Sequence, residues 1–324
     1  MNWISSVQNL HRQTDLTRPL KKLSGHNGGV NSFLLVLFSV FLLLVLLGGC
    51  TPVVYTDEET TQQSNYQIWV DLSWNSLVQK KKTLEKKGLH LVKVSPYIIQ
   101  GKNYYAGIWH PGDFETRLWK ARSWSEFQTQ WETFKMDDFR LFDLEIFDEQ
   151  KRQRFVGVWI ESDLPRRVKV NIDWKAFLVL RNTLATEGYR LIDIEPYVLR
   201  GKIKFAGIWV ESDADHRLWK TSNKKEFIRK WKEFDQQGLK LVDLEIFRES
   251  GRKKYAGVWL AGDDEQHLWI EGSWREFRNK QAEFDRMDMQ LIDLEVDIER
   301  GRKVFSGVWR GVAEEVLTSL EGIQ

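Results

Sequence analysis

The 324-residue chain contains 42% hydrophobic and 29% charged residues, a globular composition that excludes collagen-like, wholly disordered and multi-span membrane proteins. Its net charge is +2, and residues 1–32 alone contribute +3, so the remaining chain sums to -1. This near-neutral remainder argues against a nucleic-acid partner, because phosphate binding needs clustered Lys and Arg. The unusual counts are 16 Trp and one Cys.

The first segment of the chain reads as an export signal. Residues 33–49 are uncharged and almost entirely apolar, and they follow a basic leader. We expect the basic side to stay in the cytoplasm and everything after residue 50 to be translocated. The run ends in Leu47-Gly48-Gly49-Cys50, which resembles the bacterial lipobox, and the resemblance implies lipidation of Cys50. The alternative is an uncleaved signal anchor, which the long leader favours.

A polar segment without periodicity, residues 50–65, follows the leader 1–49 and predicts a flexible tether. A single cysteine allows no intramolecular disulfide, so packing has to stabilise the exported domain, residues 66–324.

A period of 50 residues organises this domain. A Gly followed two residues later by a Trp recurs without slippage at Gly107/Trp109, Gly157/Trp159, Gly207/Trp209, Gly257/Trp259 and Gly307/Trp309. A fixed period of this size indicates stacked supersecondary units that share one core. We place five units near residues 72–121, 122–171, 172–221, 222–271 and 272–321.

Each unit begins with a helix in this prediction. Trp124, Phe127, Trp131 and Phe134 are three or four residues apart, which predicts an amphipathic helix over about 124–136.

Three strands are expected after each helix. Residues 140–147 alternate apolar and acidic side chains, and a basic turn then leads to a second strand such as 254–259. An acidic loop precedes a third short strand such as 216–220. The predicted class is α+β, with a helix followed by three antiparallel strands in every repeat. Third-strand matches at both 66–70 and 316–320 leave a ring and an open, half-barrel-like array as alternatives.

The motif G-[VI]-W, after an [IV]-D-[LI]-E strand and a W-x-x-F helix, resembles the bacterial tandem repeat domain 1 family over residues 66 to about 310. These repeats also form the N-terminal domain of fungal polyglycine hydrolases, where a serine-hydrolase domain similar to β-lactamases follows. Here the chain ends about fifteen residues after Trp309. The resemblance therefore implies a repeat module for binding or positioning, without the hydrolase chemistry.

No catalytic or metal motif stands out in the sequence. Two S-x-x-K matches, at Ser222 and Ser250, lie in basic turns and lack the companion motifs of β-lactamase-like enzymes. The histidines occupy different repeat positions and show no metal-ligand spacing. We therefore predict no catalytic residue, metal site or cofactor.

Acidic pairs recur on the first strand of four units and form a candidate acidic strip. One interpretation is a strip for a cationic ligand, or carboxylates for acid–base hydrolysis. The other is a ladder of structural pairs with nearby basic residues, which recurrence favours, because a catalytic pair is needed only once. The residues are Asp143, Glu145, Asp193, Glu195, Asp243, Glu245, Asp293 and Glu295.

Candidate binding residues come from a tryptophan position that one unit lacks and from the acidic loops beside it. The invariant tryptophans look like core, whereas those at the interrupted position could stack on a sugar or grip a peptide. The loops are expected to emerge along one edge, the usual binding surface of repeat proteins. The candidates are Trp69, Trp119, Trp219, Trp269, Asp213 and Asp263.

These observations predict an exported, membrane-anchored repeat module on the extracytoplasmic side. It would bind an envelope protein or a cell-wall glycan and have no catalysis of its own. The alternatives are a carboxylate-pair hydrolase of a cell-wall glycan or peptide and a purely structural envelope protein.

Overall fold

The computed structural model describes residues 65–311. The apolar segment 33–49, the proposed lipidation site Cys50 and the strand expected at 316–320 lie outside these residues. Within residues 65–311, the helices are all too short or too polar to cross a bilayer.

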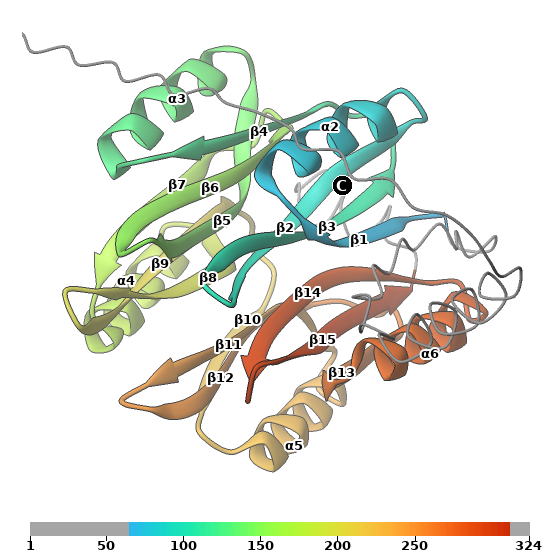
Figure 1. The fold of residues 1–324 in the computed structure, drawn as a ribbon. Coiled ribbons are helices and arrows are strands. Elements are labelled where there is room, and N and C mark those ends of the chain that lie inside the picture. Colours follow the sequence, from blue (N-terminus) through green and yellow to red (C-terminus); the bar gives the residue numbers. More distant parts are fainter. Residues whose placement is uncertain (1–64, 312–324) are drawn as a thin grey trace, which may run out of the picture. The chain divides into compact units, whose positions relative to one another are not determined.

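Five copies of a strand–helix–strand–strand unit make up residues 65–311 (Figure 1). The elements are β1 (Gln67–Leu72), α2 (Trp74–Glu85), β2 (Leu89–Ile99) and β3 (Lys102–Pro111); β4 (Thr116–Ala121), α3 (Trp124–Met136), β5 (Phe139–Glu149) and β6 (Arg152–Glu161); β7 (Arg166–Ile172), α4 (Trp174–Thr186), β8 (Tyr189–Leu199) and β9 (Lys202–Glu211); β10 (His216–Thr221), α5 (Lys224–Asp235), β11 (Leu239–Glu249) and β12 (Arg252–Ala261); β13 (Gln266–Gly272), α6 (Trp274–Asp285), β14 (Met289–Glu299) and β15 (Arg302–Gly311).

Each unit has one helix and one open, antiparallel three-stranded sheet, which confirms the predicted α+β repeat. The hairpin forms the inner and middle strands, and the strand before the helix pairs with the outer edge of the middle strand, as in the order β1-β3-β2. The short strand therefore belongs with the helix that follows it. The structural units begin near residues 66, 116, 166, 216 and 266, about six residues before the predicted boundaries.

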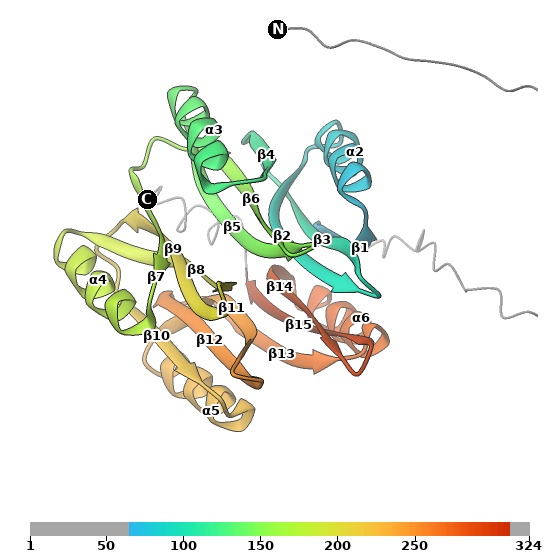
Figure 2. The same cartoon turned by 60° about the vertical axis from the view of Figure 1, so that its left-hand side comes forward.

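The inner strands β2, β5, β8, β11 and β14 contact one another in cyclic order, and β14 also contacts β2. The helices lie at the periphery, around these strands (Figures 1 and 2). The contact between first and last units gives a ring of five units, although every individual sheet remains open.

The Gly-x-Trp repeat builds the core between each sheet and its helix. All five tryptophans of this motif are fully buried. The ring of Trp109 folds back over Gly107, where a Cβ atom would lie 2.7 Å from it. Only glycine leaves room for this approach, so the two residues recur together. A phenylalanine from the helix, such as Phe127, completes the packing against Trp159 at 5.1 Å between ring centroids.

The joint between the last and first units is rich in polar contacts. Tyr66 donates to Asp285 at 2.8 Å and accepts from Trp309 at 3.2 Å. His110 is fully buried there, and its ring nitrogens contact Gln290 at 2.8 Å and the Leu291 carbonyl at 2.7 Å. These contacts join residues at least 180 positions apart, so ring closure uses specific hydrogen bonds as well as apolar packing.

Candidate functional site

A lysine surrounded by carboxylates lies where the inner strands meet, and we call these residues the axial cluster. The Lys93 amine lies 2.9 Å from Asp143, 3.3 Å from Asp243, and 3.5 Å from both Asp193 and Asp293. Lys93 occupies the repeat position that holds aspartate in the other four units. All five side chains are at least nine-tenths buried.

The place of each inner strand at the edge of its own sheet explains why aspartate recurs in the axial cluster. Every second backbone N–H of an edge strand points away from its sheet and needs another partner, and in each inner strand a register shift lies just before Lys93 or the aspartate. Asp143 accepts from the Val94 N–H at 3.0 Å, so a side chain of one unit binds the backbone of the preceding unit. Asp243 and Asp293 make the same contact, at 2.9 and 2.7 Å.

A second layer of carboxylates lies two residues farther along the inner strands: Glu145, Glu195, Glu245 and Glu295. Glu195 accepts from the Ile146 N–H at 2.9 Å. Burial and the neighbouring carboxylates raise the pKa of Glu145 and Glu245 well above its ordinary value. The second layer therefore tends to hold protons that free glutamates release.

The axial lysine and aspartates shift each other's ionisation in opposite directions. Burial alone would lower the pKa of Lys93, but the four aspartates raise it well above the ordinary value of a lysine. Burial raises the pKa of Asp243 to about 7, although Lys93 acts against that rise. Lys93 therefore remains charged, and it is the main counterion of the four axial aspartates.

The predicted acidic strip is thus located in the interior, with partners that sequence reasoning did not identify. The structural interpretation expected nearby basic residues as partners, but Arg140, the basic residue three positions before Asp143, donates to the Lys135 and Phe139 carbonyls. The axial carboxylates bind Lys93 and backbone N–H groups, and their burial keeps them away from a polymeric substrate. In residues 65–311, no group of three or more His, Cys, Asp or Glu side chains could hold a metal ion.

The interrupted tryptophan position differs between units in a way that depends on one helix residue. Lysines lie over three of the rings: Lys80 over Trp69 at 3.1 Å, Lys230 over Trp219 at 5.1 Å and Lys280 over Trp269 at 5.4 Å. The corresponding helix residue in the second unit is Gln130.

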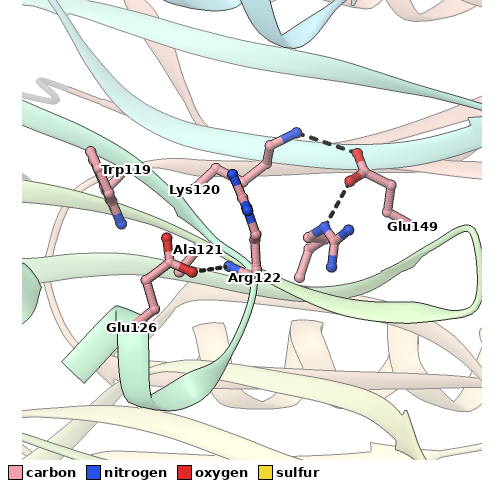
Figure 3. Close-up of a pocket in the computed structure, with 7 residues that line it drawn as sticks. Trp119, Lys120, Ala121, Arg122, Glu126 and Glu149 are labelled. Carbon is pink, nitrogen blue, oxygen red and sulfur yellow. Dashed lines mark hydrogen bonds and ion pairs between the residues drawn. The ribbon is translucent and has the colours of Figure 1, made fainter. Parts of the chain in front are cut away.

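Trp119 is accordingly the open member of this set, with 36% of its surface exposed. It lines a cavity of about 350 Å³, the Trp119 groove, together with Lys120, Ala121, Arg122, Glu126, Glu149 and Arg154 (Figure 3). Among the described residues, the ring of Trp119 has no cation over it.

Ion pairs fix most of the groove, and one cation stays free. Lys120 and Arg154 both contact Glu149, at 3.3 and 2.7 Å. Glu126 accepts from the backbone N–H of Arg122 at 2.9 Å (Figure 3). The guanidinium of Arg122 has no ion-pair or hydrogen-bond partner in the described part of the chain. A flat aromatic face beside an unpaired guanidinium can bind a ring with a polar or anionic substituent.

The two candidate loop residues do not join this groove. Asp213 and Asp263 are exposed, and neither lines the Trp119 groove. The Asp213 carbonyl accepts from Arg190 at 3.2 Å, which ties the loop to its own sheet. The structure therefore brings together Trp119 and Arg122, and sequence reasoning overlooked the latter.

Comparison with known proteins supplies one finding. The family model described as polyglycine hydrolase-like, structural repeat (BTRD1) matches residues 64–112, 119–162, 166–212 and 222–261, more than half of the chain. The first and third ranges span whole strand–helix–strand–strand units, whereas the second begins within β4 and the fourth begins after β10. A search of curated proteins yields no significant match.

Proposed function

Because this chain belongs to the family of polyglycine hydrolase-like structural repeats, we propose that it is a non-catalytic binding module held at a membrane. Fold alone does not assign a function, so the proposal rests on individual sites. The basic leader, the apolar segment 33–49 and Cys50 support export and anchoring at the cell envelope.

The open ring of Trp119 carries the binding part of the proposal. In three units a lysine of the same chain lies over the ring, whereas in the second unit Gln130 leaves it accessible beside a cavity. Exposed tryptophans with a polar neighbour are typical contact residues for sugars and for protein partners. The proposed ligand is a cell-wall glycan or an envelope protein.

Co-sedimentation of residues 61–324 with purified cell-wall glycan tests the glycan form of this proposal. We expect saturable binding that Trp119→Ala abolishes. Gln130→Lys should weaken it at least tenfold, because it supplies the lysine of the sister units. Trp219→Ala is the matched control, since that ring is already covered, and it should bind normally.

A photo-crosslinking residue at the exposed position 125, next to the lining residue Glu126, tests the protein form in intact cells and leaves Trp119 and Arg122 in place. A specific adduct that Gln130→Lys suppresses would support an envelope-protein partner. The proposed binding role of the groove is wrong if glycan binding does not depend on Trp119 and no crosslinked adduct is suppressed by Gln130→Lys.

A further inference from the structure

The near-neutral net charge conceals two oppositely charged ends of the ring. Lys93 and the four axial aspartates lie at the same height along the five inner strands. Each inner strand then runs the same number of residues to its hairpin turn, so the five turns lie at one end of the ring. Residues 98–104, 148–154, 198–204, 248–254 and 298–304 contain 14 basic and 4 acidic residues, a net +10. We call these segments the hairpin end.

The loops between the middle strand of one unit and the outer strand of the next lie at the opposite end of the sheets. Residues 111–116, 161–166, 211–216 and 261–266 contain 10 acidic residues and one arginine, a net -9. The two ends therefore differ by 19 charges, which gives the domain a strong electrical polarity along the direction of its strands.

Many cations of the hairpin end are free to meet a partner. Its three glutamates are already paired, Glu149 with Lys120 and Arg154, Glu249 with Lys220 and Lys254, and Glu299 with Lys253. Eight other cations are exposed and form no ion pair or hydrogen bond within residues 65–311: Lys102, Lys151, Arg152, Arg200, Lys202, Arg252, Arg300 and Arg302.

Contacts between neighbouring hairpins make these cations part of one surface. Asn103 donates to Glu149 at 3.4 Å, and Gln153 donates to the Val198 carbonyl at 3.1 Å. Lys253 lies 3.0 Å from Asp297 in the last pair of units.

Apolar side chains project among the cations. Ile98 is 41% exposed and Val198 is 48% exposed, and each lies within four residues of an unpaired lysine. Exposed aliphatic groups between clustered cations suit the boundary of a bilayer, where the aliphatic groups enter the headgroup layer and the cations meet anionic lipids.

We propose that the hairpin end docks on the surface of an anionic lipid bilayer. The acidic end then faces away from the membrane. Strand β1 begins at the acidic end, since Gln67 pairs with Trp109. The 16 residues of the segment 50–65 can extend to about 50 Å, which exceeds the roughly 37 Å length of an 11-residue inner strand. An anchor at Cys50 can therefore reach the membrane at the hairpin end although β1 begins at the acidic end.

Vesicle co-sedimentation tests this proposal on residues 61–324, which form a compact unit of their own and lack the apolar segment. The probes are phosphatidylcholine vesicles and vesicles with 30% phosphatidylglycerol. We expect binding only to the anionic vesicles, with at least tenfold weaker binding when salt rises from 0.05 to 0.5 M.

Two double variants locate the contact. Arg200→Glu with Lys202→Glu should weaken vesicle binding at least tenfold. Lys225→Glu with Lys232→Glu, on the exposed face of α5, changes the net charge equally and should leave binding within twofold. Val198→Ser should weaken it at unchanged charge. Equal loss in the two double variants, or binding to polyphosphate or duplex DNA without binding to vesicles, would overturn the proposal.

Discussion

The axial cluster and the Trp119 groove each depend on one unit that departs from the repeat, from four sister units in the first case and from three in the second, but with opposite results. In the interior, Lys93 replaces the recurring aspartate and supplies the counterion that four carboxylates need. On the surface, Gln130 replaces a lysine and leaves an aromatic ring uncovered. A departure from the repeat thus completes the structure where it is buried and creates an accessible site where it is exposed.

Removing the axial lysine is expected to have the largest effect. Lys93→Met leaves several buried carboxylates without their cation and should lower the free energy of unfolding by about 3–5 kcal/mol at pH 7.5. Urea denaturation measures the loss, and Lys102→Met, at an exposed and unpaired lysine, is the control. A loss below about 1 kcal/mol would mean that the axial carboxylates do not need Lys93.

The joint between the last and first units is a second interior feature in which one unit supplies a side chain that the others lack. Tyr66→Phe removes the hydroxyl between Asp285 and Trp309 and should cost about 1–3 kcal/mol, because both partners lose a buried hydrogen bond. Tyr104→Phe, measured by the same denaturation, should change stability little. Equal effects of the two substitutions would show that closure does not depend on this hydroxyl.

The pH dependence of stability tests whether the second carboxylate layer holds protons. Its raised pKa values mean that, above about pH 4.5, the unfolded chain releases protons that the folded chain keeps. Stability should therefore decrease from pH 6.5 to 8.5, through the pKa of about 7 of Asp243. Below pH 6.5 the buried His110 opposes this trend, since burial lowers its pKa and the unfolded chain takes up the proton.

Replacing Glu145 and Glu245 by glutamine separates these contributions. The double variant should show a flatter decrease between pH 6.5 and 8.5 and be more stable than the unmodified chain at pH 8.5. An unchanged slope would mean that the glutamates are ionised in the folded protein.

The surface departure should change stability least. Gln130→Lys is expected to raise the free energy of unfolding by roughly 0.5–1 kcal/mol through a cation–π contact with Trp119. Lys230→Gln should lose a similar amount by uncovering Trp219. Thermal unfolding of both variants measures these changes in stability. A lower stability of Gln130→Lys would contradict the equivalence of the four ring positions.

The periodicity of the sequence predicted most of the fold. The expected helix over 124–136 is α3, and the expected hairpins match the inner and middle strands in every unit. The pairing of the short strand was not predictable from its sequence, because the same pattern can pair forwards or backwards along the chain. The resemblance to the repeat family was confirmed by the match over four repeats.

The candidate sites were less accessible to sequence reasoning. The acidic pairs were visible, but the repeat position that reads lysine once and aspartate four times was the overlooked signal of the axial cluster. Trp119 could be named, whereas its exposure depends on Gln130, eleven residues away on the facing helix. Such contacts arise only when the units are placed in three dimensions.

The cyclic contacts also determine where new chain termini could be placed. In the ring, Gly311 and Tyr66 occupy the repeat positions of Pro111 and Thr116, which four residues connect. A linker of that length between Gly311 and Tyr66 should close the backbone, and new termini could then be cut at any of the other loops. Circular permutants of this kind would turn the joint between the first and last units into an ordinary local connection.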